Sequence, residues 1–280
     1  MPLNGLMKPT PKVQIKLASR RSSERRSPDR QVAKTETGEP IGRSALLPLL
    51  AFGAHPDDIE FGCGGVIAKE TRAGRAAHFV ICSRGEAASH GTPAQRVREA
   101  KNAASILGAT IDFIELDGDA HLEVRAAHAI KLAGIIRRLQ PDIVLAPSLV
   151  ENQHPDHPRL GQIVRDACRL ARYGGVRELR KSPVHAIERL FYYAVTAEAE
   201  PANITPVLID VSEPKILAGW RAAMEAHASQ ISARNYVELQ LTRARLRGLR
   251  AGGGHAIALF PNDPLVLDSL ACASRSARRF

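Results

Sequence analysis

The sequence predicts one α/β domain, built on a Rossmann-like, doubly wound, mostly parallel sheet with helices on both faces. Short apolar runs alternate along the chain with longer stretches in which apolar residues recur at helical spacing, a pattern typical of parallel β-α-β units. The apolar runs are continuous, as expected for strands covered on both faces. Aromatic residues make up only 4% of the chain and alanine is abundant, which favours close helix packing over an all-β sandwich.

The predicted elements follow one another from residue 46 onward. Glycines end several of the helical stretches, among them Gly108 and Gly174, and Pro214 stands in the first turn of a later helix, where its missing N–H does no harm. The predicted strands cover residues 46–53, 78–83, 111–116, 143–146, 190–195 and 207–211. The predicted helices cover residues 64–72, 93–107, 124–139, 158–173, 213–228 and 235–250.

Four loops are predicted at the carboxyl ends of the first four strands, where ligands of open parallel sheets bind. These loops carry a dense set of polar and ionisable residues, including an HPDD and an HPDH motif. The predicted fold and the predicted site therefore support each other. The loops cover residues 54–63, 84–92, 117–123 and 148–158.

The charge of the chain is unevenly distributed. The net charge is +10, and the first 45 residues hold ten Lys and Arg but only four Asp and Glu. Because this segment lacks sustained apolar periodicity, we expect residues 1–45 to be a basic, disordered extension. One folded domain follows over residues 46–270, with a basic tail over residues 271–280. The body is close to charge balance, which argues against a nucleic-acid partner, and an arm that binds acidic partners is the alternative for the extension.

The cysteines and the hydropathy indicate a compartment. Four cysteines are widely spaced and form no CxxC pair, which is typical of reduced thiols in the cytosol, so we expect a cytoplasmic protein. No run of about 18 apolar residues is present, so we predict no transmembrane helix and no membrane partner. The apolar stretch over residues 45–54 is too short to span a bilayer and too far from the N-terminus to be a secretory signal.

His55-Pro56-Asp57-Asp58 follows the first predicted strand. Imidazole and carboxylate groups suit a borderline cation such as Zn²⁺. The spacing lets His55 and Asp58 converge on one ion if the chain turns at Pro56. Asp57 would then lie near the metal and be free to accept a proton. Spacing alone does not decide which aspartate takes which role.

His154-Pro155-Asp156-His157 follows the fourth predicted strand. One of its histidines can complete a set of two histidines and one aspartate, and three protein ligands are typical of a catalytic zinc site. The other histidine would then face the substrate, and the residues alone leave this choice open. Asp156 could hold a ring N–H and fix the tautomer of that histidine.

Either motif alone is most simply a turn that caps a helix. Two such motifs at corresponding ends of two parallel strands favour a metal site. Two histidines and one carboxylate also bind Fe²⁺ in non-haem oxygenases, but those enzymes commonly use a jelly roll. We therefore predict one Zn²⁺ per chain and a hydrolytic reaction, with Fe²⁺ as the alternative metal.

Other features have weaker interpretations. Gly62-Cys63-Gly64-Gly65 is interpreted as a tight loop-to-helix junction, since no G-x-x-x-x-G-K-[ST] motif is present. Arg84 could bind a substrate hydroxyl or carboxylate through its planar guanidinium, or form a salt bridge to Glu86 or Glu99. Arg96 and Glu99 are spaced as partners one helical turn apart. Five histidines have no recognisable partners: His78, His121, His128, His185 and His227.

Three stretches in order carry a family resemblance: GAHPDDIEFGCGGVIAK, SRGEAASHGTPAQRVREAKNAASILGA and QHPDH. They resemble the PIG-L/LmbE family of zinc-dependent N-acetylglucosaminyl deacetylases, over most of residues 47–250. The stretch DDIEFGCGG and the later AMEAHASQ, residues 223–230, are most similar to the bacillithiol-pathway branch. That branch acts on an N-acetylglucosaminyl malate.

The resemblance implies a role for each residue of the two motifs. It implies that Asp57 is the general base, that His154 stabilises the oxyanion and that Asp156 orients His154. The implied substrate is a small amino sugar whose N-acetyl amide is hydrolysed by metal-activated water. Three residues would be the zinc ligands: His55, Asp58 and His157.

The C-terminal part departs from the family pattern. Many relatives carry a Tyr-Ala-Glu-like element, whereas residues 255–260 read HAIALF and contain no acid. The group conjugated to the sugar therefore does not follow from the resemblance.

Two alternatives stay open: a deacylase for a non-sugar amide, such as an antibiotic or a lipid-linked precursor, and a non-catalytic metal-dependent binding protein that uses the basic extension. The sequence also leaves open whether the chain forms a homo-oligomer.

Overall fold

The computed structural model describes residues 46–151, 154–232, 234–270, 273 and 275–277. The predicted extension over residues 1–45 and part of the predicted tail over residues 271–280 lie outside the described residues. None of the described helices is long and apolar enough to cross a membrane. The three cysteines described, Cys63, Cys82 and Cys168, are buried free thiols.

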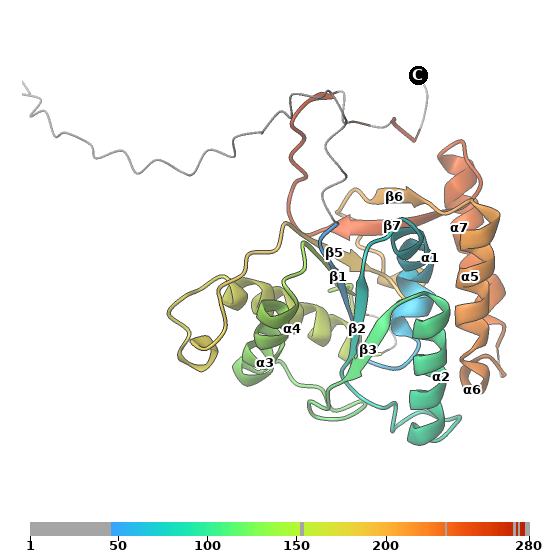
Figure 1. Ribbon diagram of the computed structural model, residues 1–280. Coiled ribbons are helices and arrows are strands. Elements are labelled where there is room, and N and C mark those ends of the chain that lie inside the picture. Colours follow the sequence, from blue (N-terminus) through green and yellow to red (C-terminus); the bar gives the residue numbers. More distant parts are fainter. Residues whose placement is uncertain (1–45, 152–153, 233, 271–272, 274, 278–280) are drawn as a thin grey trace, which may run out of the picture. The chain divides into compact units, whose positions relative to one another are not determined.

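The described residues form a seven-stranded sheet in the order β3-β2-β1-β4-β5-β7-β6 (Figure 1). The strands from β1 to β5 pair in parallel, whereas β7 is antiparallel to both of its neighbours. The prediction of a mostly parallel sheet is therefore confirmed. The strands are β1 (Leu49–Gly53), β2 (Ala77–Ile81), β3 (Thr110–Phe113), β4 (Ile143–Pro147), β5 (Arg189–Tyr193), β6 (Val207–Asp210) and β7 (Ala256–Pro261).

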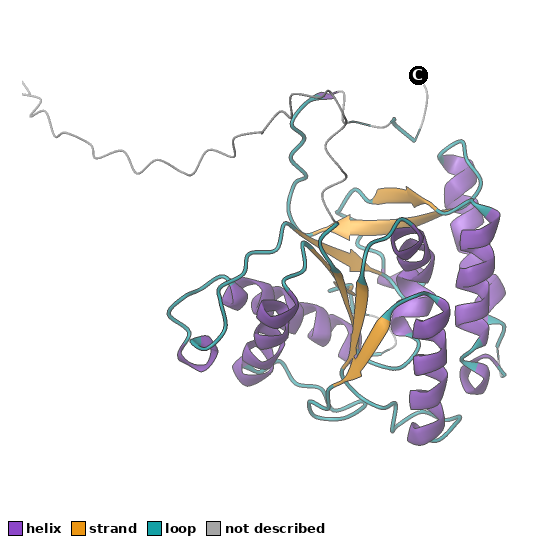
Figure 2. Ribbon diagram, in the orientation of Figure 1, coloured by secondary structure: helices purple, strands orange, loops and turns teal. Residues whose placement is uncertain are grey.

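Helices cover both faces of the sheet, as predicted (Figure 2). Leu49 and Ala51 of β1 pack into one apolar core, and Leu50 and Phe52 pack into the other, because successive strand residues point to opposite faces. The first core contains side chains of α1, α2, α5 and α7, and the second contains those of α3 and α4. The helices are α1 (Asp58–Arg72), α2 (Pro93–Ile106), α3 (Ala126–Leu139), α4 (Asp156–Ala171), α5 (Pro214–Glu225), α6 (Ala228–Ile231) and α7 (Tyr236–Arg250), with 3₁₀ turns at Arg177–Leu179 and Ala197–Ala199.

The sheet topology brings the two HPD motifs together. β1 lies between β2 and β4, so the chain order of the strands reverses at the β1–β4 pair. Open α/β sheets bind ligands at such a reversal, in the crevice beyond the carboxyl ends of the strands. The HPDD motif follows β1 and the HPDH motif follows β4, so both motifs lie at this point.

Helix α1 begins six residues earlier than the sequence predicts. It starts at Asp58 rather than at residue 64, so the four residues of Gly62-Cys63-Gly64-Gly65 lie inside the helix and not at a loop-to-helix junction. Glycine disfavours a helix interior, but here large side chains occupy the space. A Cβ atom on Gly62 would lie 2.2 Å from the Tyr193 ring, and one on Gly64 would lie 2.8 Å from the Trp220 ring. The glycines thus let α1 approach β5 and α5 closely.

Three other boundaries differ from the sequence prediction. α4 begins at Asp156, two residues early, which places the last histidine of the HPDH motif in its first turn. The predicted helix over residues 213–228 divides into α5 and the short α6. The run that lacks the acid of the family pattern, residues 255–260, belongs largely to the unpredicted strand β7, whose residues 256–260 are buried. A carboxylate in that strand would have to be buried, at a high desolvation cost.

The glycines of α1 generate a prediction. Gly62→Ala should lower the free energy of unfolding by about 1–3 kcal/mol, because the new methyl group meets the buried Tyr193 ring. Gly219→Ala in α5 is the matched control, since no atom beyond the adjacent residues and the local helix backbone lies within 4 Å of its Cβ position. That variant should gain about 0.5–1 kcal/mol from helix propensity. Urea unfolding of both variants measures the difference, and equal stability would contradict the packing argument.

Candidate metal centre and active site

Two histidines and one aspartate converge where β1 and β4 end. Asp58 is the first residue of α1, and its Oδ1 lies 3.0 Å from Nε2 of His157. Its Oδ2 lies 3.5 Å from Nδ1 of His55 and accepts the backbone N–H groups of Ala54 and His55, each at 2.9 Å. All three converging side chains are buried. Two imidazoles and one carboxylate are a ligand set found in catalytic zinc sites.

The turn between β1 and α1 directs these groups. Asp57 has a φ of 112°, a left-handed value that residues other than glycine rarely adopt. Its backbone C=O accepts the N–H of Phe61 at 3.0 Å, which starts the helix. Such strained residues cluster at functional sites. Here the turn gives two consecutive side chains different partners, because Asp57 contacts Arg96 whereas Asp58 contacts His157.

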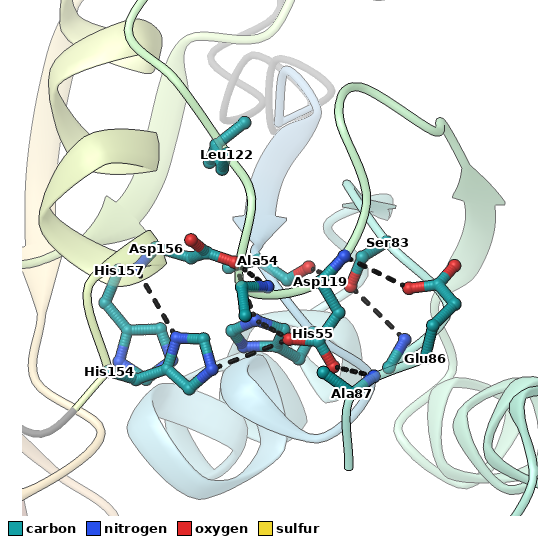
Figure 3. Close-up of polar contacts among 12 residues, drawn as sticks. Ala54, His55, Ser83, Glu86, Ala87, Asp119, Leu122, His154, Asp156 and His157 are labelled. Atoms are coloured by element: carbon teal, nitrogen blue, oxygen red, sulfur yellow. Dashed lines mark hydrogen bonds and ion pairs between the residues drawn. The ribbon is translucent and has the colours of Figure 1, made fainter.

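The second nitrogen of His55 faces two further carboxylates (Figure 3). Nε2 of His55 lies 3.1 Å from Oδ1 of Asp119 and 3.3 Å from Oδ2 of Asp156. Backbone N–H groups hold both acids in place, from Ala87 to Asp119 at 3.0 Å and from Ala120 to Asp156 at 2.8 Å. A carboxylate that accepts one ring N–H of a histidine fixes the tautomer and leaves the other nitrogen free for a metal. This arrangement leaves Nδ1 of His55 on the side of Asp58.

Arg96 supports the first motif from α2. It is buried and donates to the C=O of Pro56 at 2.8 Å, to the C=O of Gly85 at 3.2 Å and to Oδ2 of Asp57 at 3.3 Å. Burial raises the pKa of Asp57 to about 6, against the lowering effect of the Arg96 guanidinium. The expected pairing of Arg96 with Glu99 is absent from the contacts of the described residues, because the Arg96 side chain turns toward the site.

The buried charges of the site compensate one another. Burial alone would lower the pKa of His55, but the carboxylates of Asp58, Asp119 and Asp156 raise it well above its ordinary value. Burial alone would raise the pKa of Asp58, but His157 and His55 hold it well below its usual range. So many buried carboxylates need nearby positive charge. A divalent cation fits this requirement.

His154 lies at the open side of the cluster. Its side chain is one-third exposed, its ring centroid lies 4.1 Å from that of His55, and its Nε2 lies 3.5 Å from Oδ1 of Asp119. The backbone N–H of Asp156 donates to its Nδ1 at 3.3 Å. The carboxylate of Asp156 itself lies against His55, because Asp156 is the first residue of α4 and its side chain accepts the N–H of Ala120. Among the contacts described, His154 meets the carboxylate of Asp119 and the backbone N–H of Asp156, and the role of Asp156 in orienting His154 stays a prediction.

Proximity alone does not separate the two histidines of the second motif. The ring nitrogens of His55, His154 and His157 lie within 4.8 Å of one another, and so do ligand atoms of His55, Asp119, His154 and Asp156. The burial and the Asp58 contact distinguish His157, since His154 is the more exposed of the two.

Arg84 lies on the surface, away from these contacts. Its Nε is 2.5 Å from Oε1 of Glu115, both side chains are more than half exposed, and its backbone N–H donates to Glu86. The expected pairing of its guanidinium with Glu86 or Glu99 is thus replaced by a pairing with Glu115. Its role in substrate binding stays a prediction.

The structure adds a site residue that the motifs did not indicate, Asp119, and it gives partners to histidines for which none was recognised. Asp119 stands in the loop over residues 117–123, which the fold prediction placed at the site, but no pattern marked it out. His227, for which no partner was recognised, is fully buried, with Nε2 3.5 Å from Oε1 of Glu60. His128 contacts Asp117 at 2.8 Å.

The PIG-L family profile, described as GlcNAc-PI de-N-acetylase, matches residues 50–168. This range includes both HPD motifs.

Among curated proteins, 4-oxalmesaconate hydratase of Pseudomonas putida is 34% identical over 50% of this chain and 60% of its own length. The chain thus spans less than two thirds of that relative. The uncharacterized deacetylase YaiS of Escherichia coli is 34% identical over 43% of this chain and 68% of its own length.

A third relative and a solved structure extend the comparison. Diacetylchitobiose deacetylase of Thermococcus kodakarensis is 29% identical over 65% of this chain and 69% of its own length. The crystal structure of the conserved protein TT1542 from Thermus thermophilus superimposes with a TM-score of 0.70 at 30% identity, covering 82% of this chain and all of that one. With both HPD motifs inside the matched profile, the chain belongs to the PIG-L family of deacetylases.

Proposed function

We propose that this protein is a metal-dependent deacetylase that hydrolyses the N-acetyl amide of an N-acetylglucosamine derivative. The observation that carries the proposal is the convergence of His55, Asp58 and His157 beside the half-buried Asp57. The family description and the diacetylchitobiose deacetylase among the relatives support an acetylated amino sugar as the substrate class. We further propose that the reaction takes place in the cytoplasm, in accord with the three described cysteines, which are free thiols.

The proposed metal ligands are His55, Asp58 and His157. Their mixed nitrogen and oxygen donors favour Zn²⁺, and Fe²⁺ suits the same set. A cation held there would supply Lewis-acid activation of water and of the amide carbonyl. Asp119 and Asp156 would keep the ring of His55 oriented through its Nε2.

The remaining polar side chains would handle the protons. Asp57 is positioned by Arg96 and would accept the proton of the attacking water and pass it to the departing amine. His154 would donate a hydrogen bond from Nε2 to the amide oxygen as negative charge develops there. The backbone N–H of Asp156 donates to Nδ1 of His154. Because Nδ1 then acts as the acceptor, the ring proton of a neutral His154 lies on Nε2, as this role requires.

The two histidines of the HPDH motif should separate metal binding from catalysis. His157→Ala should lose most of the bound metal, because one of the three proposed ligands is then missing. His154→Ala should keep a full complement of metal but lose roughly 10²–10³ in kcat. Elemental analysis of both purified variants measures this, and equal metal content in the two would contradict the ligand assignment.

The base assignment is tested at Asp57. Asp57→Asn keeps the size of the side chain but removes the proton acceptor, so kcat should fall by roughly 10²–10⁴. Metal content and the thermal unfolding midpoint should stay close to those of the wild type. Full activity in a variant that still binds metal would refute the role of Asp57 as the general base.

A second candidate function is hydration of a carbon–carbon double bond. It is favoured by one observation, the 34% identity to a protein named 4-oxalmesaconate hydratase. Both reactions use an activated water and an acceptor for its proton, so the cluster itself does not separate them. Hydration has no departing amine, and an assay of products therefore distinguishes the two.

The deciding experiment is a substrate screen with and without a chelator. We expect N-acetylglucosamine conjugates to release primary amine and acetate, and the chelator to abolish the release. Non-sugar N-acyl amides and an unsaturated 2-oxo tricarboxylate are the comparison substrates. Turnover of the tricarboxylate alone would replace deacetylation by hydration, and turnover of the non-sugar amides alone would change the substrate class.

A further inference from the structure

Residues 227–230, His-Ala-Ser-Gln, lie outside the loops at the carboxyl ends of the first four strands, yet they contact three elements that carry the site. The segment begins with His227, which is fully buried with its Nε2 3.5 Å from Oε1 of Glu60. Its ring centroid lies 6.2 Å from that of Phe61. Glu60 and Phe61 belong to the first turn of α1, directly after Asp58. The start of the segment is therefore anchored beside the first motif.

Ser229 connects the segment to α2. Its hydroxyl donates to Oε2 of Glu99 at 2.6 Å, and its backbone N–H donates to Oε1 of Glu99 at 3.1 Å. Arg96, one turn earlier on the same helix, donates to Asp57 and to the C=O of Gly85. One turn of α2 thus contacts the site through Arg96 and the segment through Glu99.

Gln230 connects the segment to the loop over residues 85–92. Its Nε2 donates to the backbone C=O of His90 at 2.8 Å and to Oγ of Ser229 at 2.9 Å. Gly91 packs so closely on the segment that a Cβ atom there would lie 2.8 Å from Oγ of Ser229. Because His90 and Gly91 are exposed, the loop lacks apolar burial there, and these polar contacts hold its tip.

The opposite end of this loop seats a site residue. The carboxylate of Glu86 accepts the N–H of Asp119 at 3.2 Å, and the N–H of Ala87 donates to the Asp119 carboxylate at 3.0 Å. Asp119 in turn contacts His55 and His154 (Figure 3). A continuous set of contacts therefore runs from Gln230 through the loop to the imidazoles of the candidate active site.

We propose that Ser229 and Gln230 are positioning residues, which hold the loop over residues 85–92 in the conformation that seats Asp119 beside His55 and His154. The effect on substrate rests on the proposed deacetylase function, whereas the effect on the loop does not. Neither residue touches the reacting atoms, and both act through the loop.

The expected kinetic signature follows from a population shift. Without the Gln230 contact the loop spends part of its time in conformations that do not seat Asp119. If substrate binds only the seated conformation, the apparent KM equals the intrinsic KM divided by the fraction of molecules in that conformation. A lower seated fraction therefore raises KM, while kcat changes little. Loss of one neutral hydrogen bond corresponds to roughly a three- to tenfold change. A general loss of folding would instead lower kcat and the unfolding temperature together.

The experiment compares substitutions in the short helix α6 and at its C-cap. Gln230→Met keeps the length of the side chain but removes the donor, and Ser229→Ala removes the hydroxyl. Gln230→Lys restores an N–H donor within reach of His90. Ser232→Ala is the matched control, because Ser232 is exposed and its hydroxyl contacts only the C=O of Ser229 among the described contacts. Amide hydrogen exchange over residues 84–92 and the kinetics on an N-acetylglucosamine conjugate are measured for all four.

We expect roughly three- to tenfold faster exchange over residues 84–92 in Gln230→Met and Ser229→Ala, and a rise in KM by at most the same factor, with kcat within about twofold. Gln230→Lys and Ser232→Ala should resemble the wild type. Unchanged exchange, or a fall in kcat at constant KM, would overturn the proposal. If the wild type turns over no N-acetyl sugar, the deacetylase function fails, and the exchange data alone decide whether the segment holds the loop.

Discussion

The site depends on the orientation of one buried imidazole, that of His55. Its Nδ1 faces Asp58, and its Nε2 faces Asp119 and Asp156, which follow β3 and β4 in the chain. A histidine has only two ring nitrogens, so carboxylates on both sides fix the plane of the ring, and the two at Nε2 would also fix its tautomer when a cation is bound at Nδ1. The parallel sheet makes this possible, because β1 lies between β2 and β4 and the loops of several strands reach the same ring.

The charge of this arrangement explains why the surrounding backbone is so constrained. Buried carboxylates are costly unless hydrogen-bonded or paired, and three of those here accept backbone N–H groups. Asp58 uses Ala54 and His55, Asp119 uses Ala87, and Asp156 uses Ala120. Two of the loop residues involved, Asp57 and Ala120, have positive φ values. The strain is compensated because each turn places an N–H or a carboxylate where the imidazoles need it.

Much of this architecture follows from the sequence. Continuous apolar strands and helical periodicity predicted the parallel sheet, and the two HPD motifs marked the correct strand ends. The start of α1 was not predictable in this way, since Gly62 and Gly64 disfavour a helix until Tyr193 and Trp220 are known to pack on them. Strand β7 was missed because its apolar run could not be told from other buried structure. Asp119 and His227 were missed because their partners are distant in the chain.

The same physics explains how relatives with one fold can carry names as different as hydratase and deacetylase. The imidazoles and carboxylates sit at the ends of strands that the apolar cores hold in place, so substitutions elsewhere barely move them. The loop over residues 85–92 is held differently, by polar contacts from Arg96, Asp119 and Gln230 and with little apolar burial. Such a loop can change its sequence and shape without disturbing the core. The sheet therefore fixes the positions of these imidazoles and carboxylates, whereas a loop with few anchors can vary around them.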